Sequence, residues 1–184
     1  MPEAALSNPE SLPPSLTALA LNPVPVRPDG TGAIPPQILH MPFLQRLELL
    51  EGEGLHGLEE SLQQLTQLTY LSLTDTHLDH LPPSMSALCN LRQLHLFNPN
   101  HAQAQEPDLS FLSVLARLQM LDVSLHSGMQ QAPPQLAQLT NLVVLHLEET
   151  PLEALPGSLS SLVHLQVLGA AYTAVPVAAC FGQD

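Results

Sequence analysis

One leucine pattern recurs along this chain and constrains its fold more than any other feature. The pattern is L-x-x-L-x-L, and successive copies begin 23 to 28 residues apart. The seven copies start at Leu16, Leu44, Leu68, Leu91, Leu118, Leu142 and Leu165, with Val123 and Ala170 replacing the last leucine in two of them. Self-similarity at such a period is typical of a solenoid, in which each repeat buries its apolar face against its neighbours.

Each repeat has two halves with different patterns. In the third copy, Leu68, Leu71 and Leu73 supply the apolar face of a predicted short strand, whose other residues point to the opposite face. The second half often carries a proline pair, as at Pro82-Pro83 and Pro133-Pro134. Proline suits the first turn of a helix because its missing N–H would have no partner there. Short strands should therefore alternate with brief helices or 3₁₀ turns.

Two repeats depart from this pattern. The segment Pro107–Leu118 lies in a copy that is 27 residues from its predecessor, and it predicts a longer helix. In the repeat that begins at Leu44, Glu59 and Glu60 stand in place of the proline pair, and this segment also predicts a helix.

From about Leu16 to Pro176 these motifs resemble leucine-rich repeats of the subclass in which L-x-x-L-P-x-x-L follows the strand. The resemblance implies an α/β solenoid with a curved parallel sheet on its concave side and short helices or 3₁₀ turns on its convex side. The family usually has asparagine in the turn after the strand. Here Thr76, Thr150 and Thr173 hold that position, and they are expected to make a weaker version of the asparagine hydrogen bond.

The proline–leucine repeat, with threonine in the asparagine position and an abundance of Ala, Gln and His, is also similar to the repeats of certain effectors. These are leucine-rich-repeat type III effectors that plant-associated bacteria inject into host cells. This resemblance implies a cytoplasmic protein, or one that the bacterium secretes into a host cell. Residues 1–15 are expected to be a flexible or irregular lead-in, and residues 16–176 form about seven repeats. Residues 177–184 are expected to be either a short cap or the point where a longer chain has been cut.

Charge and composition exclude several classes of function. The formal charge is −13, from 17 acidic residues against four Arg and no Lys, which argues against nucleic acid and anionic membranes as partners. Cys89 shares its register position with a threonine or valine in other repeats, and Cys180 has no basic neighbour to activate it. Because no phosphate-binding loop or activated nucleophile is present, neither enzymatic activity nor a cofactor is expected.

The residues between and just after the strand leucines should form the concave face. Those in the central repeats combine aromatic and apolar side chains with polar ones, as protein interfaces do. They predict a monomeric module that binds a partner protein through these residues: Tyr70, Ser72, Thr74, Gln93, His95, Phe97, Met120, Asp122, Val144, His146 and Glu148. A competing interpretation is that the aromatic residues merely favour β structure. The competing function is a structural or targeting repeat region within a larger, ubiquitin-ligase polypeptide.

His95, Asp122 and His146 fall in one column of this predicted face. They could hold a metal ion, act as a pH-sensitive patch, or form a solvated polar ladder. The two histidines should lie two strand spacings apart, about 9–10 Å, which is wide for one zinc ion. The polar ladder is therefore favoured and no metal site is predicted, while the pH-sensitive patch stays open.

Overall fold

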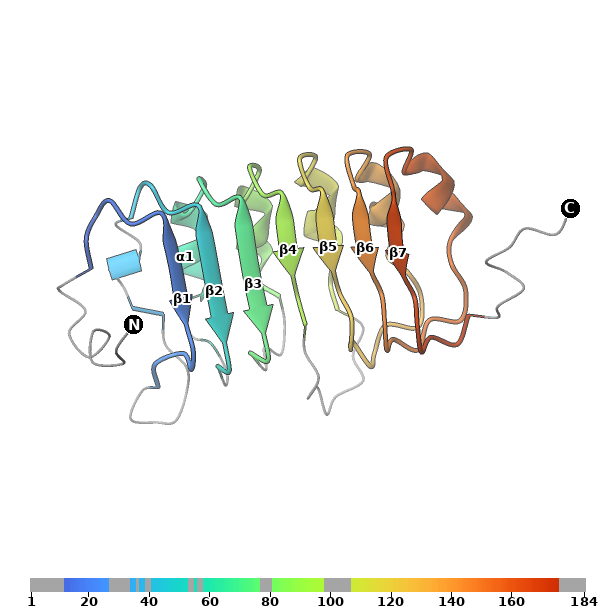
Figure 1. The fold of residues 1–184 in the computed structure, drawn as a ribbon, viewed down its shortest axis with the longest axis horizontal. Coiled ribbons are helices and arrows are strands. Elements are labelled where there is room, and N and C mark those ends of the chain that lie inside the picture. The colour runs from blue at the N-terminus through green and yellow to red at the C-terminus, as the bar shows by residue number, and fades with distance from the viewer. Residues whose placement is uncertain are drawn as a thin grey trace, which may run out of the picture.

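A computed structural model of the chain describes residues 12–26, 34, 35, 37, 38, 41–52, 55, 58–76, 81–97 and 107–175. Within them, seven short strands form one sheet in which sequence order is also spatial order (Figure 1). Every neighbouring pair is parallel. The strands are β1 (Ala18–Leu21), β2 (Arg46–Leu50), β3 (Tyr70–Thr74), β4 (Gln93–His95), β5 (Met120–Asp122), β6 (Val144–His146) and β7 (Val167–Gly169).

Short helical segments connect the strands and lie behind the sheet in Figure 1. They are the α-helix α1 (Leu58–Gln64) and the 3₁₀ helices η4 (Pro83–Ala87), η5 (Ser110–Val114), η6 (Pro134–Gln138) and η7 (Gly157–Ser161). The prediction of a parallel sheet backed by brief helices is confirmed, and so is the helix predicted around Glu59 and Glu60. We call the helix-free side of the sheet the open face.

The longer helix predicted over Pro107–Leu118 is wrong, because only the five residues of η5 are helical, and they form a 3₁₀ turn. The reason lies in the leucine spacing. Leu109, Leu112 and Leu115 are all buried and three residues apart, and each of the last two donates its backbone N–H to the carbonyl of the one before. A 3₁₀ helix has three residues per turn, so it keeps all of them on one side. An α-helix would rotate some of them away from the core.

The core lies between the sheet and the helical segments and is almost entirely aliphatic. Strand leucines such as Leu47, Leu71, Leu94, Leu121 and Leu145 are fully buried, with no exposed surface. Each buried leucine contributes about 1.5–3 kcal/mol relative to an exposed one. Successive repeats thus share one continuous core, and this makes the sheet a firm platform for the side chains on its open face.

In five repeats of the described part, the chain leaves the sheet through a turn at the same position of the repeat. The residue that follows the strand at this position adopts a positive φ, between 53° and 62°. These residues are Glu51, Asp75, Leu125, Glu149 and Tyr172. Residues other than glycine, asparagine and aspartate are disfavoured in this left-handed region. The repeat therefore stores backbone strain at the carboxyl end of several strands.

Two of the three threonines in the position that the family gives to asparagine form hydrogen bonds within their own repeat. Thr150 Oγ1 donates to the carbonyl of Leu147 at 2.7 Å, and Thr173 Oγ1 donates to that of Ala170 at 2.9 Å. His126, which was not singled out in the sequence, occupies the same position in its repeat. It is buried, and its Nδ1 lies 3.0 Å from the carbonyl of Val123. A hydroxyl or an imidazole can therefore replace the asparagine locally.

Hydrogen bonds from side chains to the preceding repeat lie near the opposite, amino ends of the strands. Asn90 Nδ2 donates to the carbonyl of Thr66 at 3.0 Å, and Asn141 Nδ2 donates to that of Ala116 at 2.8 Å. Thr69 Oγ1 makes a comparable bond to the carbonyl of its neighbour in the preceding repeat, at 3.1 Å. These bonds fix the stacking of repeats beside the open face.

Strand β7 ends the described part of the sheet, and its leucine is less covered than the others. Leu168 is 41% exposed, although it occupies the position of buried leucines in the preceding strands. The cap or cut expected at residues 177–184 lies outside the described residues, as does most of the expected lead-in. None of the described helices is long and apolar enough to cross a membrane.

Candidate partner-binding face

The structure brings the predicted site residues together on the open face of β3 to β6. Tyr70, Gln93, Met120 and Val144 are paired strand to strand in one row. Ser72, His95, Asp122 and His146 are paired in the next row. Thr74 ends β3, while Phe97 and Glu148 lie just beyond the ends of β4 and β6. The alternation and phase of the leucines predict these rows correctly.

An aromatic stack lies at the centre of this face. The Tyr70 and His95 rings are 5.2 Å apart between centroids and tilted by 40°. Arg46, on the neighbouring strand β2, places its guanidinium carbon 3.5 Å from the centroid of the Tyr70 ring. It also forms an ion pair with Glu48. A guanidinium over an aromatic face is attracted by the ring quadrupole, so Tyr70 is held from both sides.

Arg46 was not among the predicted site residues. It stands in the same row as Tyr70, one strand earlier, and neighbouring strands are only about 4.8 Å apart. An arginine beside a tyrosine in one row is the signal that identifies this stack from sequence.

Asp122 interacts with His95 and with the residue two places after it. Its Oδ2 lies 3.8 Å from His95 Nδ1, and its Oδ1 accepts the Ser124 backbone N–H at 3.0 Å. Partial burial raises the pKa of Asp122, but the interactions with His95 and Ser124 outweigh it, so the pKa lies below its usual value. Asp122 is therefore a carboxylate at neutral pH.

His146 pairs with Glu148 rather than with Asp122. His146 Nδ1 lies 2.9 Å from Glu148 Oε1, and Ser124 Oγ donates to Glu148 Oε2 at 2.9 Å. Partial burial raises the pKa of Glu148, but these partners together hold it below its usual value. His95, Asp122 and His146 are thus aligned in one row, but their side chains form two separate acid–imidazole pairs, His95 with Asp122 and His146 with Glu148.

Among the residues that the structure describes, no group of three or more His, Cys, Asp or Glu side chains could hold a metal ion. The two histidines each face a different carboxylate, as in a polar ladder.

Gly169 leaves the space that the His146–Glu148 pair occupies. It is aligned with His146 on the next strand. A Cβ at this position would lie 2.0 Å from Glu148 Oε1 and 2.7 Å from His146 Nδ1. Neither distance is possible without moving the pair, so the glycine permits a polar pair that any other residue would displace.

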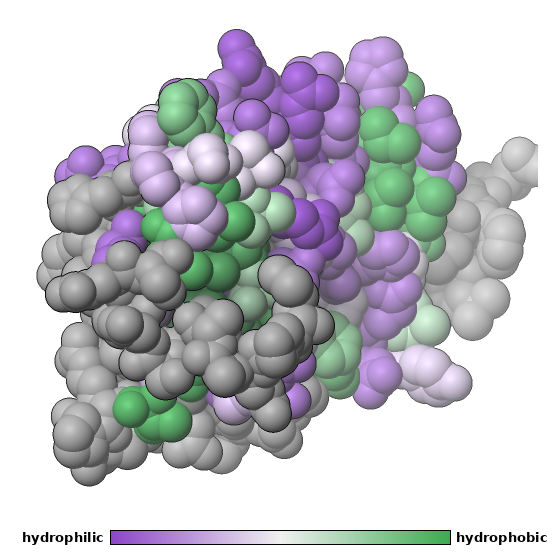
Figure 2. Space-filling view, turned by 60° about the vertical axis from the view of Figure 1, so that its left-hand side comes forward, coloured by the Kyte–Doolittle hydropathy of each residue, from purple (hydrophilic) through white to green (hydrophobic). Residues whose placement is uncertain are grey.

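Exposure differs among the predicted site residues. Gln93 is exposed, whereas Tyr70, Phe97 and Met120 are half-buried. Ser72 is only 5% exposed, and its hydroxyl is 3.0 Å from that of Thr74. It therefore offers a partner little area. Figure 2, turned so that the amino-terminal end of the sheet comes forward, shows hydrophilic and hydrophobic side chains beside one another on the surface.

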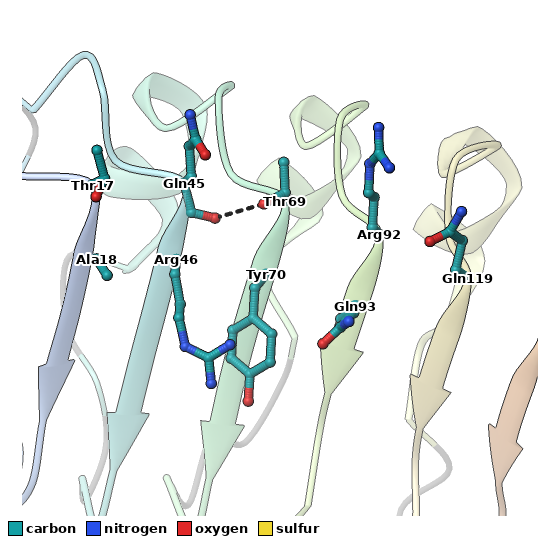
Figure 3. Close-up of a pocket in the computed structure, with 9 residues that line it drawn as sticks. All are labelled: Thr17, Ala18, Gln45, Arg46, Thr69, Tyr70, Arg92, Gln93 and Gln119. Carbon is teal, nitrogen blue, oxygen red and sulfur yellow. Dashed lines mark hydrogen bonds between the residues drawn. The ribbon is translucent and has the colours of Figure 1, made fainter.

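A shallow depression of about 470 Å³ crosses the amino ends of β1 to β5. Figure 3 shows its lining, which includes the Arg46–Tyr70 stack and the residues that directly precede the strands. The described lining residues are Thr17, Ala18, Gln45, Arg46, Thr69, Tyr70, Arg92, Gln93 and Gln119. We call this depression the rim groove. The predicted site includes only Tyr70 and Gln93 from it.

No protein-family model matches the chain, and no curated protein matches it. Solved structures do. The leucine-rich repeat domain of the type III effector XCV3220 (XopL) is 26% identical, with a TM-score of 0.65, over 85% of this chain and 52% of that one. The plant peptide hormone receptor RGFR1, solved in complex with RGF2, is 25% identical, with a TM-score of 0.63, over 89% of this chain and 26% of that one.

An internalin (InlF) from Listeria monocytogenes is 21% identical, with a TM-score of 0.61, over 88% of this chain and 49% of that one. The chain thus spans about half the length of two of these structures and about a quarter of the third. Its fold is the leucine-rich-repeat solenoid, a fold that generally serves protein interaction.

Proposed function

We propose that this chain is a monomeric recognition module that binds a partner protein through the open face of its sheet. The observation that carries this proposal is the stack of Arg46, Tyr70 and His95, set among polar side chains on a rigid sheet. Tyrosine and arginine dominate interface hot spots. Because repeats on both sides fix the strands, little conformational entropy is lost when a partner binds.

The proposed contact residues divide by chemistry. Tyr70, Phe97 and Met120 supply apolar area, with Val144 beside them. Gln93, His95 and His146 supply hydrogen bonds. Asp122 and Glu148, held as carboxylates by their lowered pKa values, supply negative charge. A partner that carries a basic patch would be steered to this strongly acidic chain. Ser72 and Thr74 contribute mainly to the shape of the surface.

Likeness to two of the solved structures supports a recognition role. One is a hormone receptor solved together with RGF2, and another is the repeat domain of a type III effector. With the sequence resemblance described above, the second favours a finer proposal. The chain acts as the recognition part of a bacterial effector inside a host cell, and its task is binding rather than catalysis.

Affinity capture from host-cell extract tests this proposal. Tagged wild-type chain should retain a partner that the double variant Tyr70→Ala, Phe97→Ala loses, while thermal melts of the two remain close. A matched control is Ser113→Ala with Val114→Ala on the exposed surface of η5, which should retain the partner. Retention by the open-face variant together with loss by the η5 variant would move the site to the helical side.

A further inference from the structure

Positive and negative charges are segregated along the strands. The described part of the chain has three arginines, and all lie at the amino ends of strands: Arg46 begins β2, Arg92 directly precedes β4, and Arg117 lies just ahead of β5. The opposite ends carry carboxylates in the turns that follow the strands, namely Glu51, Asp75 and Glu149. The carboxylates of Asp122, which pairs with His95, and of Glu148, which pairs with His146, also lie toward those ends. The sheet edge with positive charge is therefore distinct within an acidic protein.

Two of these arginines line the rim groove, and no acidic residue is among its described lining residues. The rest of its lining is largely hydroxyl and amide: Gln45, Gln93 and Gln119 are exposed and can donate hydrogen bonds. Backbone bonds fix this edge, because each residue before a strand donates its N–H to the equivalent residue of the previous repeat. Hydrogen-bond donors therefore face a solvent-open space of about 470 Å³.

The two arginines are differently engaged. Arg46 is oriented by its stacking on Tyr70 and by its pairing with Glu48. Arg92 is exposed, and within the described residues its guanidinium forms no ion pair or hydrogen bond. Arg117, by contrast, donates to Asn90 Oδ1 at 2.6 Å and lies outside the groove. Among the described residues, the Arg92 guanidinium is thus unpaired, and Figure 3 shows it extending from the amino end of β4, away from the Arg46–Tyr70 stack.

From this arrangement we propose that the rim groove binds an acidic side chain, aspartate or glutamate, of the partner protein. Arg92 is its main ligand, with its planar donors matched to a carboxylate. The neighbouring glutamine amides complete the site. The inference rests on the proposed function and refines it: the bound segment of the partner is acidic where it crosses the amino ends of the strands and basic where it crosses the carboxylates.

Peptide titration of the full chain tests the groove directly. The probe is the capped tripeptide Gln-Glu-Gln, and its matched control is Gln-Gln-Gln. In NMR spectra of labelled protein, the glutamate peptide should shift the Arg92 side-chain Nε–H signal and the Gln93 and Gln119 amides saturably, and the control should not. Removing one charged hydrogen-bonding group should weaken this binding about tenfold or more in Arg92→Gln.

Arg117→Gln removes the same charge outside the groove and should leave the affinity unchanged. Equal weakening by Arg117→Gln would show a general charge effect and overturn the proposal, as would equal shifts with the control peptide. A phosphoserine peptide that binds where the glutamate peptide does not would also overturn it, in favour of a phosphate site. If the glutamate peptide does not bind but Phe97→Ala still abolishes partner capture, the inference falls and the proposed function stands. If the glutamate peptide binds through Arg92 but Phe97→Ala does not affect partner capture, the groove stands and the proposed function falls.

Discussion

Nδ1 of His146 lies 2.9 Å from Oε1 of Glu148, two residues further along the chain. Both side chains are partly exposed on the open face, at about 30% of their surface. Because residues two apart on an extended strand point to the same side, this pair forms within one repeat. It does not require Asp122, which lies opposite His146 on the neighbouring strand.

The lowered pKa of Glu148 links the pair to stability. A carboxyl whose pKa is lower in the folded state stabilises the fold fully above its unfolded pKa, near the ordinary value of 4.5, and this stabilisation is lost as pH falls through the folded pKa. Glu148→Gln should therefore be less stable than wild type near neutral pH, and the two should converge in acid. Urea unfolding between about pH 7 and about pH 3 measures this. A difference that does not change with pH would exclude the linkage.

Gly169→Ala should displace the His146–Glu148 pair, because the new Cβ would lie 2.0 Å from Glu148 Oε1. The ends of the two side chains can move, so the fold should survive, while the pKa of Glu148 rises toward its ordinary value. Carboxyl NMR titration of Glu148 reads out this change. Gly157→Ala is the matched control, since nothing lies within 4 Å of its added Cβ. An unchanged Glu148 titration in Gly169→Ala would contradict the packing described for this glycine.

Tyr172 has a φ of 58° and is 86% exposed, so it holds a strained conformation with little packing in return. Asparagine tolerates the left-handed region better than other residues except glycine. Tyr172→Asn should therefore raise the free energy of unfolding by about 0.5–1 kcal/mol. Denaturant unfolding beside Tyr172→Ala, which gains no such relief, is the measurement. A loss of stability in the asparagine variant would show that the tyrosine ring packs more than its exposure indicates.

The three-residue leucine step in η5 makes a further prediction. Leu115 is fully buried, whereas the adjacent Val114 is 47% exposed. Leu115→Ala should lower the free energy of unfolding by about 2–5 kcal/mol. Val114→Ala should change it by no more than about 0.5 kcal/mol. Similar losses in both variants would indicate that η5 is rotated relative to this structure.

The strands and the rows of side chains across them were predictable because they depend only on the alternation of leucines within each repeat and on the spacing between repeats. The repeat places Tyr70, Gln93 and Met120 at the same distance from their leucines, and parallel pairing then aligns them. The helix predicted over Pro107–Leu118 is wrong because the buried leucines of this segment lie on one side of a 3₁₀ turn and would not do so on an α-helix. Their spacing of three residues was visible in the sequence, and it favours a 3₁₀ turn.

The pairing of side chains within the face was less predictable, because it depends on side-chain torsions as well as on register. His146 could face Asp122 on the preceding strand or Glu148 in its own repeat, and only the structure shows the second arrangement. The rim groove was missed for another reason. Its key residue, Arg92, directly precedes the strand, whereas the predicted face included only the positions of each repeat that correspond to Tyr70, Ser72 and Thr74.

The most direct test of the central claim is the affinity of the captured partner for Tyr70→Ala, measured by calorimetry beside wild type and Val114→Ala. Truncating a hot-spot aromatic should cost about 2 kcal/mol, or roughly thirtyfold in Kd, while the variant on the helical side binds like wild type. Unchanged affinity in Tyr70→Ala, with weakening in Val114→Ala, would contradict recognition through the open face.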